Sequence, residues 1–121
     1  MAQNTGTIIV KADGQSLRAK MESVTFKPGK FGREAVMADG RVVGYFEKPM
    51  ASEVTFDAVH DGDTDVDFLR NLTNATVVLE FDSGPVWQID DAFSDNEATE
   101  IGDGGKGMKV KINGKAAEQV A

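Results

Sequence analysis

The chain has 121 residues, a formal net charge of −7 and no cysteine. This length is typical of one domain with a modest core. A negative surface repels phosphate, so a basic groove that grips nucleic acid is not expected, and the lack of cysteine excludes disulfides and thiolate ligands. No stretch resembles a secretory signal or the roughly 20 apolar residues of a membrane span, so we expect a soluble protein with no membrane partner.

The first part of the chain predicts a β-hairpin over residues 7–21. Ile8 and Val10 recur at every second position, which is the periodicity of a half-buried strand. Asp13 and Gly14 then form a two-residue turn signal. Thirteen glycines along the chain also favour many short strands joined by tight turns.

Residues 20–40 look least like a core, because they combine few apolar residues with a local excess of basic ones. The bases of this segment and its flank are Lys20, Lys27, Lys30, Arg33 and Arg41. One interpretation is an ordinary solvated loop. The other is a mobile arm that meets an acidic surface on another copy of the same protein.

Two further strands are predicted over residues 42–46 and 52–59. In the second, Val54 and Phe56 alternate with Glu53 and Asp57, so one face is apolar and the other acidic. The next segment, residues 61–74, predicts the one helix of the chain. Thr64 can cap its first turn, and an apolar stripe follows.

A second hairpin is predicted over residues 74–92, around a turn at Asp82-Ser83-Gly84-Pro85. Its strands place the only tryptophan, Trp87, among apolar residues, and we expect a core centred here. The core is expected to bury Leu79, Phe81, Trp87 and Ile89 with Leu69 and Leu72 of the helix. A last strand is expected over residues 108–112, followed by a loose tail at 115–121.

No motif in the chain predicts an enzyme, a metal site or a cofactor. Asp61, Asp63 and Asp65 imitate the opening of a calcium loop, but the residues needed later in that loop are missing. A literal GxGxxG at residues 102–107 precedes a strand, whereas a dinucleotide site needs it before a helix. His60 is the only histidine, so a catalytic triad or metal cluster would depend on one residue.

Four blocks of sequence, in the same order over most of the chain, resemble the tail tube protein of Mu-like contractile-tailed bacteriophages. The blocks are Gly32-Arg33-Glu34-Ala35-Val36-Met37, Gly44-Tyr45-Phe46-Glu47-Lys48-Pro49, residues 76–93 around Trp87, and Gly107-Met108-Lys109-Val110-Lys111-Ile112-Asn113-Gly114. The resemblance implies a mainly β fold, an antiparallel β-sandwich or partly rolled barrel with one short flanking α-helix. The whole chain, residues 1–121, would be one tail-tube domain.

The resemblance also implies a structural role without catalysis or cofactors. Hexameric rings would stack into a hollow tube inside a contractile sheath, and genomic DNA would pass through the lumen without specific binding. Other implied partners are the sheath, baseplate and tail terminator proteins. The protein would be assembled in the host cytoplasm and reside in the virion.

Two sets of residues are candidates for these roles. An acidic lumen lining would let DNA slide, and its candidates are Glu53, Asp57, Glu80 and Asp82. The candidates for an arm that reaches the next ring are Lys27, Lys30, Arg33 and Arg41. Two alternatives stay open: a tube subunit of a type VI secretion or bacteriocin-type machine, and a small monomeric β-sandwich that binds a ligand.

Overall fold

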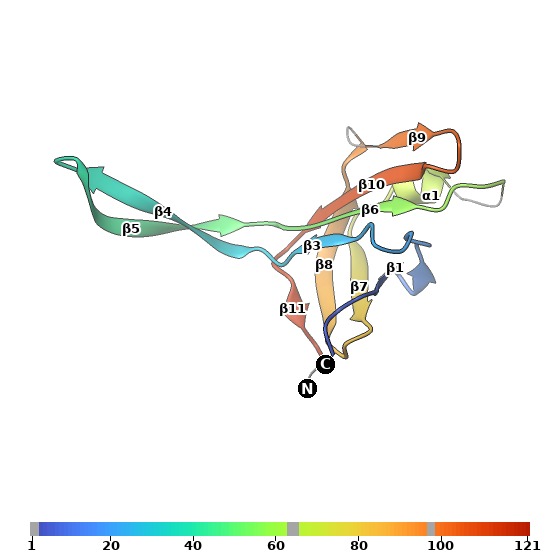
Figure 1. Cartoon of the computed structure of the whole chain (residues 1–121), viewed down its shortest axis with the longest axis horizontal. Coiled ribbons are helices and arrows are strands. Elements are labelled where there is room, and N and C mark those ends of the chain that lie inside the picture. The colour runs from blue at the N-terminus through green and yellow to red at the C-terminus, as the bar shows by residue number, and fades with distance from the viewer. Residues whose placement is uncertain (1–2, 63–65, 97–98) are drawn as a thin grey trace.

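The computed structural model describes residues 3–62, 66–96 and 99–121. It is mainly β, with antiparallel strands and one short helix, which confirms the expected fold class. The strands form a curved sheet folded over a core and a separate two-stranded hairpin that projects from it (Figure 1). The curved sheet does not close into a barrel. In the described residues, no helix is long and apolar enough to cross a membrane.

The first half of the curved sheet, here called sheet A, contains the hairpin that the sequence predicts around Trp87. Its central pair is β7 against β8, with β1 and β2 beyond β7 and β11 on the other side of β8. The strands are β1 (Ile8–Ala12), β2 (Gln15–Ser16), β7 (Ala75–Phe81), β8 (Val86–Ser94) and β11 (Glu118–Gln119). The amide of Gly84 donates to the carbonyl of Phe81 at 3.0 Å, which closes the predicted turn.

The second half, sheet B, follows the order β3, β6, β10, β9, with every neighbouring pair antiparallel. Its strands are β3 (Thr25–Lys27), β6 (Ser52–Ala58), β9 (Glu100–Gly102) and β10 (Gly107–Gly114). The end of β8 joins this half by pairing with β10. The register of β8 against β7 shifts where Asp91 has a φ of 51°, so a bulge bends β8 from one half into the other.

The core lies between the two halves because both supply strands with alternating apolar side chains. On β6, Val54, Phe56 and Ala58 are buried, whereas the residues between them are only half-buried. β10 and β7 repeat the pattern, so one face of each strand is removed from water. The larger buried apolar residues are Val10, Val54, Phe56, Leu69, Leu72, Val77, Leu79, Ile89, Met108, Val110 and Ile112.

Two aromatic residues expected in the core, Trp87 and Phe81, are only partly buried against it. Both meet the ring of Phe26, whose centroid lies 5.6 Å from that of Trp87 and 6.1 Å from that of Phe81, each edge to face. These rings lie near the turn at Asp82–Pro85, where the sheet ends. The expected burial of Trp87 and Phe81 therefore holds only in part, because they pack at the edge of the core, whose centre is filled by aliphatic residues together with Phe56 and Met108.

The helix α1 (Val66–Arg70) is shorter than the predicted span of 61–74. Leu69 and Leu72 are buried as expected. The last helical hydrogen bond runs from the amide of Asn71 to the carbonyl of Asp67. The carbonyl of Leu72 then accepts a hydrogen bond from the amide of Ser94 on β8, so the chain has already returned to the sheet. The predicted cap, Thr64, lies outside the described residues.

The projecting hairpin consists of β4 (Lys30–Ala38) and β5 (Arg41–Met50). The strand predicted over residues 42–46 lies within β5, whereas β4 is the main departure from the predicted elements. The tip of the hairpin is Asp39-Gly40, with φ values of 53° and 73°, as a two-residue type I′ turn requires. The segment 20–40 was expected to form the arm. In the structure β3 pairs with β6, and the projecting part is residues 30–50.

The base of the hairpin is tightly built. Gly29 has a φ of 78°, and a Cβ atom there would lie 2.8 Å from the carbonyl oxygen of Met50 and from the backbone of Ala51. The amide of Ala117 donates to the carbonyl of Pro28 at 2.9 Å, and the hydroxyl of the buried Ser52 donates to the carbonyl of Lys115 at 2.7 Å. The C-terminal segment therefore braces the point at which the hairpin leaves the sheet.

Residues 115–121, expected to be a loose tail, are hydrogen-bonded to the body along this segment. β11 pairs with β8, and the amide of Val120 donates to the carbonyl of Val86 at 2.8 Å. Lys115 Nζ lies 2.7 Å from a carboxylate oxygen of Asp91. This hydrogen bond and the negative charge raise the pKa of Lys115 above its usual value. How mobile the tail is stays a prediction.

The core can be tested with two residues of the same strand. Ile89→Ala removes a side chain that is 0% exposed, so the free energy of unfolding should fall by about 2–5 kcal/mol. Phe93→Ala is the control, because Phe93 is 47% exposed and its loss should change stability much less. Urea denaturation of unassembled subunits measures both values, and equal losses would contradict this assignment of the core.

The base of the hairpin can be tested by adding one methyl group. Gly29→Ala forces a side chain into the left-handed region and against the backbone of the returning strand, which should cost about 1–3 kcal/mol and lower the melting temperature. Gly44→Ala is the matched control, because nothing lies within 4 Å of a Cβ atom there. Indistinguishable melting curves for the two variants would count against the tight base.

Candidate assembly surface

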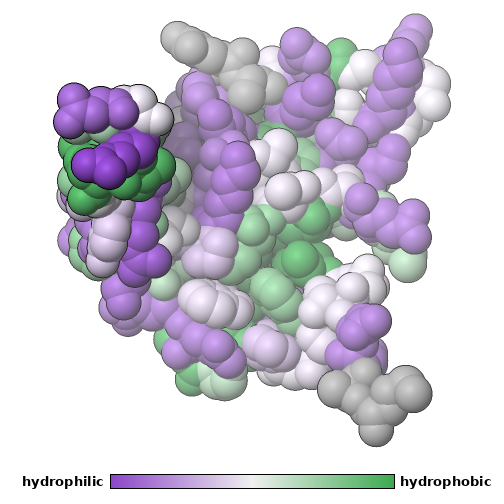
Figure 2. Space-filling view, turned by 60° about the vertical axis from the view of Figure 1, so that its left-hand side comes forward, coloured by the Kyte–Doolittle hydropathy of each residue, from purple (hydrophilic) through white to green (hydrophobic). Residues whose placement is uncertain are grey.

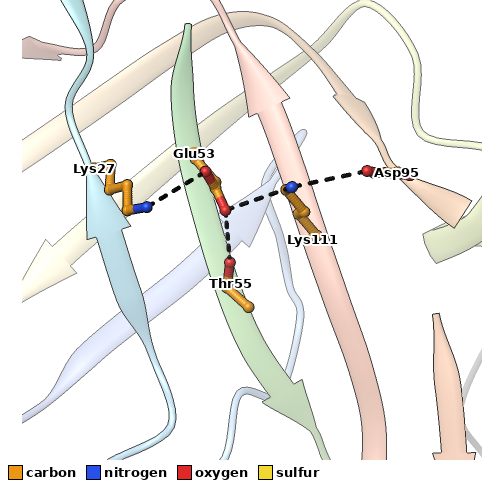
Figure 3. Close-up of polar contacts among 5 residues, drawn as sticks. All are labelled: Lys27, Glu53, Thr55, Asp95 and Lys111. Atoms are coloured by element: carbon orange, nitrogen blue, oxygen red, sulfur yellow. Dashed lines mark hydrogen bonds and ion pairs between the residues drawn. The ribbon is translucent and has the colours of Figure 1, made fainter. Parts of the chain in front are cut away.

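The outward face of sheet B carries charged side chains of both signs. The carboxylate of Glu53 on β6 lies 3.9 Å from Lys27 Nζ on β3 and 3.7 Å from Lys111 Nζ on β10. Lys111 Nζ in turn lies 3.9 Å from Asp95, and the hydroxyl of Thr55 lies 3.3 Å from Glu53 (Figure 3). These contacts link four neighbouring positions across the sheet. We call this surface, with Asp57, Lys109 and Glu100, the charged face.

The four acidic residues predicted to line a lumen are therefore not one continuous negative surface. Glu53 and Asp57 lie on β6 and are flanked by lysines of β3 and β10, with Lys109 directly opposite Asp57. Glu80 and Asp82 belong to the other half of the molecule, because β8 and β10 separate β7 from β6. The alternation identified outward-facing acids correctly, but it contained no information on which strands pair.

The two acids of sheet A have partners of their own. Glu80 lies 3.3 Å from Lys11 Nζ on β1, and Asp82 accepts a hydrogen bond from the amide of Gly6 at 3.0 Å. Asp82 therefore fastens the segment before β1 to the turn between β7 and β8. Their role as lumen residues stays a prediction.

The hairpin β4–β5 exposes most of its apolar side chains. Tyr45 is 66% exposed and Phe46 is 47% exposed, and they face opposite sides of the ribbon because they are neighbours on one strand. Figure 2 shows green apolar surface on the hairpin, at the left of the view, next to purple polar groups. The large exposed apolar residues of the hairpin are Phe31, Val36, Met37, Val42, Val43, Tyr45, Phe46 and Met50.

The charges along the hairpin are largely satisfied within it. Arg33 Nε lies 3.2 Å from Glu47, and its guanidinium group lies 5.8 Å from the centroid of the Tyr45 ring on the same face. On the opposite face Lys48 forms an ion pair with Glu34. Each face therefore combines one internal ion pair with unburied apolar side chains.

The predicted basic arm is divided by this geometry. Lys27 lies on β3 of sheet B and pairs with Glu53, and Arg33 pairs with Glu47 on the hairpin. Lys30 begins β4 and Arg41 begins β5 at the tip, and neither has an ion pair among the residues that the structure describes. A count of basic residues along the sequence could not show this division, because the acids that pair with Lys27 and Arg33 lie on neighbouring strands.

The exposed apolar residues of the hairpin are the functional feature that sequence reasoning missed. The sequence does contain a signal, because between Phe31 and Met50 apolar residues stand at both odd and even positions. Neither face of the ribbon is therefore purely polar. In residues 3–62, 66–96 and 99–121, no three histidine, aspartate or glutamate side chains are placed to hold a metal ion. His60 is exposed beyond the end of β6. The arrangement is suited to contact between polypeptide surfaces.

Known proteins support this interpretation. The family model described as phage tail tube protein matches residues 1–119. The Mu-like prophage FluMu tail tube protein of Haemophilus influenzae is 34% identical over 110 residues, which cover 91% of this chain and 88% of that protein. The tail tube protein of Escherichia phage Mu is 28% identical over 119 residues, or 98% of this chain and 97% of the relative. The chain therefore belongs to the phage tail tube protein family.

Proposed function

We propose that copies of this chain associate into hexameric rings that stack into a hollow tail tube. The observation that carries this proposal is the hairpin β4–β5, which projects from the body with both faces uncovered. The role is structural, without catalysis, and the assembled protein is a component of the virion. Membership of the phage tail tube protein family supports this assignment.

The hairpin needs a partner for a physical reason. A lone two-stranded ribbon is at best marginally stable in water, and each of its strands leaves one edge unpaired. Complete burial of one Val, Phe or Met side chain contributes about 1.5–3 kcal/mol. Covering even a few of the eight large apolar side chains on the hairpin therefore supplies a strong drive for association.

A second copy is the partner that fits this surface best. The ion pairs Arg33–Glu47 and Lys48–Glu34 lie within the hairpin, so covering it leaves few unpaired charges to desolvate. An apolar contact of this kind is typical of permanent assemblies, whose interfaces resemble a domain core. The hairpin of one copy would lie against the bodies of neighbouring copies and so connect rings.

The cations of the hairpin would add to ring stacking. Lys30 and Arg41 lie at opposite ends of the ribbon, and Arg33 lies between them. In a chain with a net charge of −7, the surface that such a hairpin reaches on another copy is acidic on average. Lys27 would act within the ring, since it belongs to sheet B.

The assembled tube would conduct genomic DNA within a contractile sheath. A lumen in which carboxylates such as those of Glu53, Asp57, Glu80 or Asp82 lie beside the basic side chains would not hold the phosphate backbone of DNA tightly. The sheath, baseplate and tail terminator proteins would contact the outside and the ends of the tube. Assembly would take place in the host cytoplasm.

Polar substitutions on the hairpin test the proposed drive. The double variant Tyr45→Ser/Phe46→Ser removes one large aromatic from each face, so it should leave the subunit folded but reduce assembly at least about tenfold. The control Met21→Ser/Val120→Ser changes two exposed apolar residues outside the hairpin. Sedimentation velocity and negative-stain microscopy measure assembly. Wild-type protein that stays monomeric at high concentration, or a double variant that assembles normally, would contradict the proposal.

Charge reversal tests the stacking role of the cations. Lys30→Glu/Arg41→Glu should leave single rings intact and shorten the stacks, because these side chains have no ion pair to lose within the described part of the subunit. Raising the salt from about 0.1 M to about 1 M shortens the screening length from about 10 Å to about 3 Å and should also shorten wild-type stacks. Tube lengths in electron micrographs measure both effects. Unchanged tube lengths in both experiments would show that these charges do not contribute to stacking.

A further inference from the structure

The methionines of the described residues differ sharply in how far solvent reaches them. Met108 is fully buried, whereas Met21, Met37 and Met50 are 78%, 60% and 48% exposed. Met37 and Met50 belong to the hairpin β4–β5, and Met21 lies outside it. The chain has no cysteine, so its thioethers are the sulfur groups that a small peroxide can oxidise.

Met50 lies across the ribbon near the base of the hairpin. It pairs with Lys30, and Gly32 is the next residue of β4 on that face. A Cβ atom at Gly32 would lie 2.5 Å from Met50 Sδ and 3.3 Å from its Cγ, so the thioether occupies the space that a side chain at Gly32 would fill. Phe46, which is 47% exposed, stands on the same face of β5. The sulfur is therefore held at a fixed place on the uncovered apolar surface.

Met37 places a second sulfur near the other end of the ribbon (Figure 1). It pairs with Val42, which is 63% exposed, and it stands two residues before the turn at Asp39-Gly40. The hairpin thus carries one accessible thioether beside its tip and one beside its base. Both belong to the surface that other copies are proposed to cover.

We propose that Met37 and Met50 are sites of oxidation to methionine sulfoxide by hydrogen peroxide or a similar small peroxide, and that this oxidation suppresses association of the subunits. The inference rests on the proposed function, because it needs the hairpin to be buried against other copies. It adds a reversible chemical control of that surface, which acts on free subunits before they assemble.

The reaction needs only the peroxide and the thioether. A lone pair of Sδ attacks one peroxide oxygen, so an S–O bond forms as the O–O bond breaks. The sulfur is oxidised by two electrons, and the peroxide is reduced by the same two. The proton on the attacked oxygen passes to the departing hydroxide, so each sulfoxide formed releases one water molecule.

The product affects association more than folding. A sulfoxide replaces a flexible apolar group with a polar one. In the free subunit, the new oxygen on Met37 or Met50 faces water, so the fold tolerates it. In an interface the same oxygen loses its water and needs a hydrogen-bond donor, and a buried acceptor without a donor weakens binding. Methionine sulfoxide reductases reverse the modification.

Peroxide treatment of free subunits tests this proposal. Peptide mass mapping should show one added oxygen on Met21, Met37 and Met50 and none on Met108, and near-ultraviolet circular dichroism should show that the subunit is still folded. After the peroxide is removed, sedimentation velocity should show that apparent affinity has fallen about tenfold or more. The two reductases, one for each sulfoxide epimer, should restore it.

Two variants identify the methionines responsible. Met37→Leu/Met50→Leu keeps apolar side chains of similar volume but removes both hairpin sulfurs. Each protein is compared with its own untreated sample, and peroxide should leave the association of this variant unchanged. Met21→Leu is the matched control, because it removes an exposed sulfur outside the hairpin and should leave association as sensitive to peroxide as in the wild type.

Wild-type subunits that associate normally with Met37 and Met50 oxidised would overturn the inference. So would a Met37→Leu/Met50→Leu variant that loses association on treatment as the wild type does. Wild-type protein that does not associate even before treatment would instead overturn the proposed function. In that case the mass map still tests the modification sites, and unmodified Met37 and Met50 in the free subunit would contradict them.

Discussion

A two-stranded ribbon cannot bury both of its own faces, and the other features of the molecule depend on this constraint. β4 and β5 place apolar side chains on both sides of such a ribbon, beyond the reach of the core. The ion pairs on it are internal, so they do not call for an acidic or basic partner. What the hairpin lacks is apolar cover. The chain belongs to the phage tail tube protein family, and we propose that neighbouring copies supply that cover.

The body of the molecule serves to hold this hairpin at a fixed place. Apolar side chains from both halves of the curved sheet form the core, and the bulge at Asp91 lets one strand contribute to both halves. The close approach at Gly29 and the bonds from the C-terminal segment to Pro28 and Ser52 then fix the hairpin base. A defined exit from the body would let every copy present its hairpin in the same direction, which a regular assembly needs.

Local alternation predicted the strands that pack on the core and the hairpin around the turn at Asp82–Pro85, because burial of one face leaves a period of two in the sequence. It also predicted the strand at residues 42–46, which lies within β5, but it missed β4 and the full length of β5, where apolar residues on both faces conflict with burial inside one chain. Trp87 was assigned to the core on its size, although a rim position also removes part of a large ring from water. The charged candidates were the least predictable, since the lysines that meet Glu53 come from β3 and β10, far apart in the sequence. Pairing of distant strands decides such contacts, and composition carries no information about it.

Hydrogen exchange on assembled tubes and on dissociated subunits tests most directly whether other copies cover the hairpin. Amides in open, uncovered ribbons exchange quickly, and burial in an interface slows them. We expect residues 30–50 to exchange readily in free subunits and to become strongly protected in tubes, while β7 and β10 are protected in both states. Equal and strong protection of residues 30–50 in free subunits and in tubes would contradict this account, because the hairpin would then need no second copy to be stable.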